Sequence, residues 1–144
     1  MGKKRIIQKS DLTTEEGRAS AVKSNLPKKK LTDSVVHIQS TYNNTIISVA
    51  DAKGDVLFTA SAGALGFRGA KKGTPYASTK VAEFLGEKAK ATGIKNLSIL
   101  VKGVGAGRES AIRSFAGQGF DIGTIRDITP VPHNGPRPAK PRRV

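Results

Sequence analysis

The 144-residue chain contains no cysteine. This absence excludes a disulfide framework, a cysteine-ligated zinc site and a thiol nucleophile. No apolar run comes near the roughly 18 residues that a membrane-spanning helix needs, so we expect no membrane partner. The first residues, Met-Gly-Lys-Lys-Arg, are followed by no apolar segment, and we therefore do not expect a secretory signal peptide.

Patterns typical of catalysis and metal binding are missing as well. No pair of carboxylates stands at a spacing that indicates acid–base catalysis or a metal site. His37 lies in a predicted strand and His133 in the C-terminal segment, and neither belongs to a motif with a nucleophile and a carboxylate. A single histidine on a strand is more often structural than catalytic. We expect a protein that is not an enzyme and that holds no cofactor or metal.

Acidic residues are scarce relative to basic ones. The chain has 11 Asp and Glu against 25 Lys and Arg, a formal net charge of +14. Such an excess indicates a nucleic-acid partner, because each Lys or Arg that meets a phosphate releases condensed cations. A surface charged only for solubility usually mixes both signs. The charge therefore favours nucleic-acid binding.

The positive charge is concentrated at the two ends of the chain. Residues 1–30 hold nine basic and three acidic residues (+6), residues 31–132 hold twelve and eight (+4), and residues 133–144 hold four and none (+4). The lysine run at 28–30 fits an arm that orders on RNA better than a nuclear-localisation sequence. The sequence predicts three parts: a basic N-terminal arm at 1–33, a folded domain at 34–129 and a proline-rich basic C-terminal arm at 130–144.

Hydrophobic periodicity predicts a single α/β domain between the arms. Strands are expected at 35–38, 45–50, 56–60, 94–101 and 120–129, and helices at 75–92 and 108–117. Thr74 is expected as the N-cap of the first helix, Pro75 as its first residue and Gly93 as its stop. Because strand–helix–strand units favour parallel, right-handed connections, we expect a five-stranded mixed sheet in the order 3-2-1-4-5 with two main helices.

Apolar spacing also predicts which side of each helix faces the sheet. The inward residues expected on the two helices are Ala77, Val81, Phe84, Leu85 and Ala89, and then Ala111, Ile112, Phe115 and Ala116. From Pro130 onward the density of proline excludes a helix or a central strand, which predicts an extended arm.

A glycine-rich turn at 103–108 joins a predicted strand to a predicted helix. Its backbone N–H groups, the helix dipole and Arg108 suit an anion. The G-x-G-x-G spacing is not a dinucleotide fingerprint, and no Gly-Lys-Ser/Thr follows that would make a P-loop. An RNA phosphate is the favoured ligand; a plain tight turn and a small-nucleotide site remain open.

A second glycine-rich segment, residues 63–73, carries Phe67, Arg68, Lys71 and Lys72. Glycines allow a phosphate backbone to approach closely, and Phe67 can stack on a base. For Phe67 a place in the core remains equally open, whereas for the three cations contact with RNA is favoured over a solvated surface. Tyr42 and Asn43 lie at a predicted exposed turn, where simple turn chemistry is the favoured interpretation.

Five motifs in order resemble the universal small-subunit ribosomal protein eleven family, of the bacterial or organellar type. The resemblance as a whole extends from about residue 33 to the C-terminus. The motifs are Tyr42-Asn43-Asn44-Thr45, Gly66-Phe67-Arg68-Gly69, Thr74-Pro75-Tyr76-Ala77, the turn from Gly103 to Arg108-Glu109, and the ending Asp127-Ile128-Thr129-Pro130-Val131-Pro132-His133-Asn134-Gly135.

The resemblance implies a ribonuclease-H-like fold without ribonuclease chemistry. It implies a structural constituent of the small ribosomal subunit that bridges rRNA helices on the platform, near the cleft for the upstream segment of mRNA. Ribosomal proteins seven and eighteen are the implied neighbours, and initiation factor three is implied nearby. The implied location is the ribosome of the cytoplasm or of an organelle.

Motif by motif, the resemblance implies a set of RNA contacts. They are Asn43, Asn44, Arg68, Lys71, Lys72, Arg108, His133, Asn134, Arg137, Lys140, Arg142 and Arg143. Two other hypotheses remain: a nucleoid-type DNA-binding protein, and a nucleotide-dependent enzyme that uses the 103–108 turn. We also hypothesise isoaspartate at Asn134, because the glycine that follows leaves its backbone N–H free to attack the Asn side chain.

Overall fold

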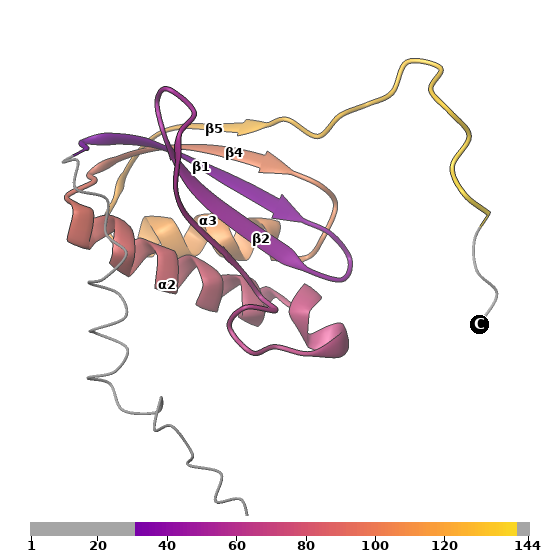
Figure 1. Ribbon diagram of the computed structural model, residues 1–144, viewed down its shortest axis with the longest axis horizontal. Coiled ribbons are helices and arrows are strands. Elements are labelled where there is room, and N and C mark those ends of the chain that lie inside the picture. Colours follow the sequence, from indigo (N-terminus) through magenta and orange to yellow (C-terminus); the bar gives the residue numbers. More distant parts are fainter. Residues whose placement is uncertain (1–30, 141–144) are drawn as a thin grey trace, which may run out of the picture.

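The computed structural model describes residues 31–140 (Figure 1). The predicted N-terminal arm therefore lies almost wholly outside the described residues. The elements follow the predicted order of three strands, a helix, a strand, a helix and a strand. They are β1 (Asp33–Ser40), β2 (Thr45–Asp51), β3 (Val56–Ser61), the 3-10 helix η1 (Gly69–Gly73), α2 (Pro75–Thr92), β4 (Asn96–Lys102), α3 (Gly107–Gly117) and β5 (Asp121–Asp127).

The five strands form one mixed sheet in the order β3-β2-β1-β4-β5, which confirms the predicted topology. The pairs β1–β2 and β2–β3 are antiparallel, and β1–β4 and β4–β5 are parallel. The parallel arrangement brings the carboxyl ends of β1, β4 and β5 to the same end of the sheet. The loops that follow these strands meet there.

Helix α2 begins and ends where local chemistry predicts. The Thr74 hydroxyl accepts a hydrogen bond from the backbone N–H of Ala77, and Pro75 fills the first helical position, where its missing N–H costs nothing. Gly93 ends the helix in the left-handed region at φ 91°, which favours glycine. The preceding loop contains one unpredicted element, the short helix η1.

Both α2 and α3 pack on the same face of the sheet (Figure 1). Alternating strand residues on that face, such as Val36 and Ile38 of β1, are buried between sheet and helices. All the predicted inward residues of α2 are buried or pack against the core. On α3 the prediction is wrong for Ala116, which is exposed, because it lies about 100° around the helix from the buried Phe115.

The described C-terminal segment, residues 130–140, runs away from the body after β5 without helix or strand (Figure 1). Its extended course is the one that the proline content predicts. Within residues 31–140 no helix has the length and apolar character to cross a membrane. The same residues contain no cluster of His, Asp and Glu arranged to hold a metal ion.

Candidate nucleic-acid interface

The turn between β1 and β2 sits between the two glycine-rich segments at one end of the sheet. A Cβ built on Gly73 would lie 2.2 Å from the carbonyl oxygen of Tyr42, and one on Gly105 would lie 2.3 Å from that of Thr41. Both positions require glycine because real Cβ atoms do not approach backbone oxygens so closely. The two glycine-rich segments and the turn therefore form one continuous surface.

Within this turn the two asparagines have different surroundings. Asn44 is half-buried, and its side-chain oxygen accepts a hydrogen bond from its neighbour, Thr45 N–H, at 3.0 Å. The carbonyl of Asn44 accepts hydrogen bonds from the backbone and the hydroxyl of Thr41. Asn43 is exposed. Asn44 thus shapes the turn, and Asn43 presents its amide outward.

The loop at residues 66–73 presents three cations that have no carboxylate within ion-pairing distance among the described residues. Arg68 and Lys71 are exposed, and Lys72 is half-buried. Some other cations of the described chain are paired, Lys80 with Glu83 and Arg113 with Glu109. A cation without a carboxylate partner keeps its full charge for an external anion.

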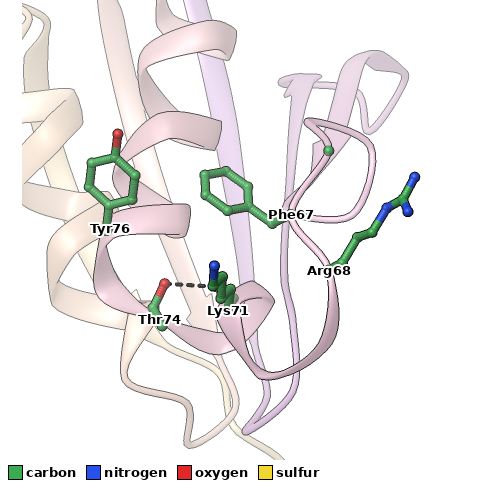
Figure 2. Close-up of a pocket in the computed structure, with 6 residues that line it drawn as sticks. Phe67, Arg68, Lys71, Thr74 and Tyr76 are labelled. Atoms are coloured by element: carbon green, nitrogen blue, oxygen red, sulfur yellow. Dashed lines mark hydrogen bonds between the residues drawn. The ribbon is translucent and has the colours of Figure 1, made fainter.

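A hollow of about 520 Å³ opens beside two of these cations, Arg68 and Lys71 (Figure 2). Two aromatic side chains lie across it. Phe67 is half-buried against the core, and Tyr76, in the first turn of α2, is 64% exposed. Their ring centroids are 6.0 Å apart with planes at 81°, an edge-to-face geometry. Phe67 therefore contacts the core, as one of its two interpretations expects, and it also lines an open hollow; its stacking on a base stays a prediction.

Arg108 is committed to contacts within the protein. Its guanidinium pairs with the carboxylate of Asp127 and donates to the carbonyl of Gly103. The hydroxyl of Thr129 donates to Asp127 at 2.5 Å and accepts from the N–H of Gly103 at 3.2 Å. This network joins the 103–108 turn to residues 127–129, at the start of the C-terminal arm.

The network also affects the acidity of Asp127. The hydrogen bond from Thr129 holds the pKa of the Asp127 carboxyl well below its ordinary value of 3.8, and the bond from Arg108 acts in the same direction. Both contacts favour the charged form. The carboxylate therefore remains ionised, and the network intact, at any pH near neutrality.

The backbone of the 103–108 turn is occupied as well. The N–H of Gly103 bonds to Thr129, and the N–H of Gly105 donates to the carbonyl of Ser40 at 3.1 Å. The carbonyl of Gly107 accepts from the buried Ser78 hydroxyl at 2.7 Å. Close packing explains the glycines of this turn, which agrees with the interpretation of a plain tight turn. The N–H groups of Gly103 and Gly105, which could otherwise bind an anion, already donate to partners within the protein.

The remaining predicted contacts lie in the C-terminal arm. Its described members, His133, Asn134, Arg137 and Lys140, are all exposed. Arg142 and Arg143 lie outside the described residues. Asn134 adopts a positive φ of 55°, which Asn tolerates better than most residues, and it makes a bend in the otherwise extended arm.

Sequence reasoning missed three residues of this surface. Tyr76 directly follows Pro75, the predicted first residue of α2, and is not one of the residues predicted to face the sheet. The apolar spacing of the helix could therefore have predicted that Tyr76 is exposed. Asp127 and Thr129 were noted only as part of a motif. Their partnership with Arg108 spans 19 and 21 residues, and no local pattern predicts a contact over that distance.

The chain was compared with known proteins. A family model described as "Ribosomal protein S11" matches residues 34–143. The small ribosomal subunit protein uS11 of Rippkaea orientalis is 53% identical over 117 residues, which cover 81% of this chain and 90% of the relative. The uS11 protein of Gloeobacter violaceus is 50% identical over 131 residues, covering 91% and 97%.

A further relative agrees with these matches. The small ribosomal subunit protein uS11c of Phaeodactylum tricornutum is 55% identical over 124 residues, which cover 85% of this chain and 95% of the relative. The matched region contains the sheet except for Asp33, the first residue of β1, together with α2, α3 and the described C-terminal arm. Because the family model and relatives at 50–55% identity all extend over most of its length, the chain belongs to the ribosomal protein S11 family.

Proposed function

We propose that this chain is a structural constituent of the small ribosomal subunit that binds and bridges rRNA helices through one end of its sheet and its C-terminal arm. The observation that carries the proposal is the 66–73 loop, where Arg68, Lys71 and Lys72 stand without carboxylate partners in the described chain beside an exposed turn. Unpaired cations on one surface are what phosphate binding requires.

The general role of the chain follows from its family. The chain is a ribosomal protein, and its role is structural and not enzymatic. Association with the small ribosomal subunit agrees with the names of the relatives. The net charge of +14 supplies the electrostatic attraction that binding to rRNA needs.

The proposed RNA contacts divide into three groups. The 66–73 loop supplies phosphate contacts, and the exposed amide of Asn43 can bond a sugar or a base edge. Arg108 and Asn44 act mainly by holding the arm and the turn in place, since their polar atoms bond within the protein. The arm supplies the rest: His133, Asn134, Arg137, Lys140, Arg142 and Arg143.

We also propose a position for the chain within the small subunit. The resemblance supports a position on the platform, close to the cleft for the upstream segment of mRNA, with ribosomal proteins seven and eighteen as neighbours and initiation factor three nearby. An exposed arm that leaves the body at a fixed point suits such a crowded site, because it can run between RNA helices while the body docks on one of them.

The test compares charge removal at the two ends of the sheet. One variant is Arg68→Ala/Lys71→Ala/Lys72→Ala. The matched control removes three exposed cations from the opposite end, Lys53→Ala/Lys90→Ala/Lys95→Ala. Affinity for in-vitro transcribed small-subunit rRNA is measured against salt concentration, and circular dichroism checks that both variants fold.

The loop variant should lose more affinity than the control. Because each phosphate-bound cation adds about one unit to the slope of log K against log salt, its slope should become shallower by about 3. Equal losses in the two variants would contradict a defined binding surface. Duplex DNA serves as competitor: if it displaces the rRNA as well as unlabelled rRNA does, the nucleoid-type alternative takes precedence.

A further inference from the structure

We propose that the hollow lined by Phe67 and Tyr76 binds the base of an unpaired rRNA nucleotide, with the exposed ring of Tyr76 as its stacking platform. The inference rests on the proposed function, because it assumes that rRNA meets this end of the sheet. It adds a ligand class to that surface: a nucleotide extruded from a loop or bulge and not a paired one.

The aromatic geometry supports a stacked ligand. Tyr76 is 64% exposed although it is a large apolar ring. Its partner Phe67 meets it edge to face at 6.0 Å, and such an arrangement cannot cover both faces of both rings. The Lys80 ammonium lies over the Tyr76 ring, 5.8 Å from its centroid, and pairs with Glu83, yet most of the Tyr76 side chain is exposed. Ring surface thus remains open to a planar ligand, which gains stacking energy there.

The rest of the lining suits the phosphate of such a nucleotide. Arg68 and Lys71 line the same hollow as the two rings, and neither has a carboxylate partner among residues 31–140. Figure 2 shows Arg68 extending away from the rings, toward the outer side of the loop. The Thr74 hydroxyl is already bonded within the protein: it accepts from the N–H of Ala77 in α2 and donates to the carbonyl of Lys71 at 2.7 Å. The hollow therefore combines an apolar interior with a cationic margin.

This combination distinguishes the ligand from its alternatives. A base inside a duplex is stacked on both faces, so only an extruded or single-stranded base offers a free face to Tyr76. An apolar side chain of a protein partner would fill the hollow but would leave Arg68 and Lys71 without a counter-charge. Stacking is tolerant of base identity, so no preference among the four bases is expected.

Tyrosine fluorescence can report on stacking of a base on Tyr76. It has no tryptophan and two tyrosines, Tyr42 and Tyr76. In Tyr42→Phe the remaining tyrosine emission comes from Tyr76 alone, and in Tyr76→Phe it comes from Tyr42 alone. A short single-stranded oligouridylate is titrated into both full-length variants, with inorganic phosphate as a second probe that provides charge without a base.

Oligouridylate should quench the emission of Tyr42→Phe, because a stacked base quenches tyrosine, and should change Tyr76→Phe much less. Inorganic phosphate should quench neither. Emission from Tyr42→Phe that stays constant while oligouridylate binds would overturn the proposal. So would equal quenching of the two variants, or a change that appears only when other subunit proteins are added, since the hollow would then serve a protein partner.

Affinity measurements separate this inference from the function on which it rests. Tyr76→Ala should weaken binding to small-subunit rRNA by about tenfold, in the range measured for loss of one stacked base, whereas Tyr76→Phe should retain the wild-type affinity because the ring remains. If Arg68→Ala/Lys71→Ala/Lys72→Ala weakens binding and Tyr76→Ala does not, the function stands and the hollow has no base. If neither does, both fail.

Discussion

Two glycine-rich basic segments of this protein look alike in sequence and differ in what they do with their charge. The 66–73 loop holds Arg68, Lys71 and Lys72 without carboxylate partners among the described residues. The 103–108 turn holds Arg108, whose guanidinium is engaged by Asp127 and by the carbonyl of Gly103. The first segment directs charge outward, and the second uses charge to hold the protein together.

The glycines do not divide between the two segments in this way, because Gly73 is as closely packed as Gly105. At Gly66 a Cβ would meet no atom within 4 Å, and only its positive φ of 92° favours glycine. At Gly105 the φ is ordinary, but a Cβ would collide with Ser40 and Thr41. Glycine content therefore does not distinguish a ligand-binding loop from a packed turn, whereas the partners of the charged side chains do.

The largest expected effect is on stability, at Gly105. Gly105→Ala forces a methyl group to 2.3 Å from the carbonyl oxygen of Thr41, and overpacking of this kind costs roughly 1–3 kcal/mol or more. Urea denaturation should show the free energy of unfolding reduced by that amount. The matched control, Gly117→Ala, meets no atom within 4 Å and should change stability little. Equal stability of both variants would contradict the packing role of the turn.

The second prediction separates the two roles proposed for Arg108. If it acts by holding the arm, Arg108→Met should weaken rRNA binding severalfold only when the arm carries its charges. In a chain whose arm is neutralised, the same substitution should have no further effect, so the double-mutant cycle shows coupling. The neutralised arm carries Arg137→Ala, Lys140→Ala, Arg142→Ala and Arg143→Ala.

The contrary result would have a clear meaning. A loss of affinity that is the same in the charged and the neutralised chains would identify Arg108 as a direct phosphate contact. In that case the difference between the two glycine-rich segments would be one of degree, and the 103–108 turn would join the binding surface.

A smaller effect should appear in acid. The pKa of Asp127 is lowered on folding, so its contribution to stability is complete above its unfolded value of 3.8 and is lost as the pH falls below it toward the folded pKa. The free energy of unfolding should therefore decrease below about pH 4, and less steeply in Asp127→Asn. Asp121→Asn, at the other end of β5, is the control; an identical acid response in the two variants would argue against the Arg108–Asp127 contact.

The smallest effect is chemical and slow. Asn134 is exposed, and Gly135 follows it in an arm without helix or strand, so nothing in the described chain prevents cyclisation of the Asn side chain. We expect isoaspartate at this position in aged free protein and not at the half-buried Asn44. Peptide mapping by mass spectrometry measures both sites, and intact Asn134 after prolonged incubation would refute the hypothesis.

Much of the fold could be predicted because it depends on local chemistry. The capping of α2 by Thr74, Pro75 and Gly93 is written in adjacent residues, and strand order follows from short antiparallel links and right-handed crossovers. The misplacement of Ala116 has a simple cause: a short helix that packs along a narrow stripe leaves a neighbouring apolar residue outside it.

The candidate site was predictable only in part, for a physical reason. Which cations are free depends on which carboxylates the fold brings near them, and the Arg108–Asp127 pair forms only when β4 and β5 are aligned. The register of that pairing shifts between Leu97 and Ser98, an irregularity that residue patterns do not contain. Sequence motifs were enough to predict which segments form the surface. Tertiary contacts decide that the cations of the 66–73 loop are free of carboxylate partners within the described chain and that Arg108 of the 103–108 turn is bound within the protein.

We propose that the chain is an integral protein of the small ribosomal subunit, held by charge at one end of its sheet. Sucrose-gradient sedimentation of a native lysate, with mass spectrometry of each fraction, tests it most directly. The wild-type chain should migrate with the small subunit and remain there in high salt, whereas Arg68→Ala/Lys71→Ala/Lys72→Ala should dissociate at lower salt. A wild-type chain at the top of the gradient, or one that is released at modest salt, would contradict the account.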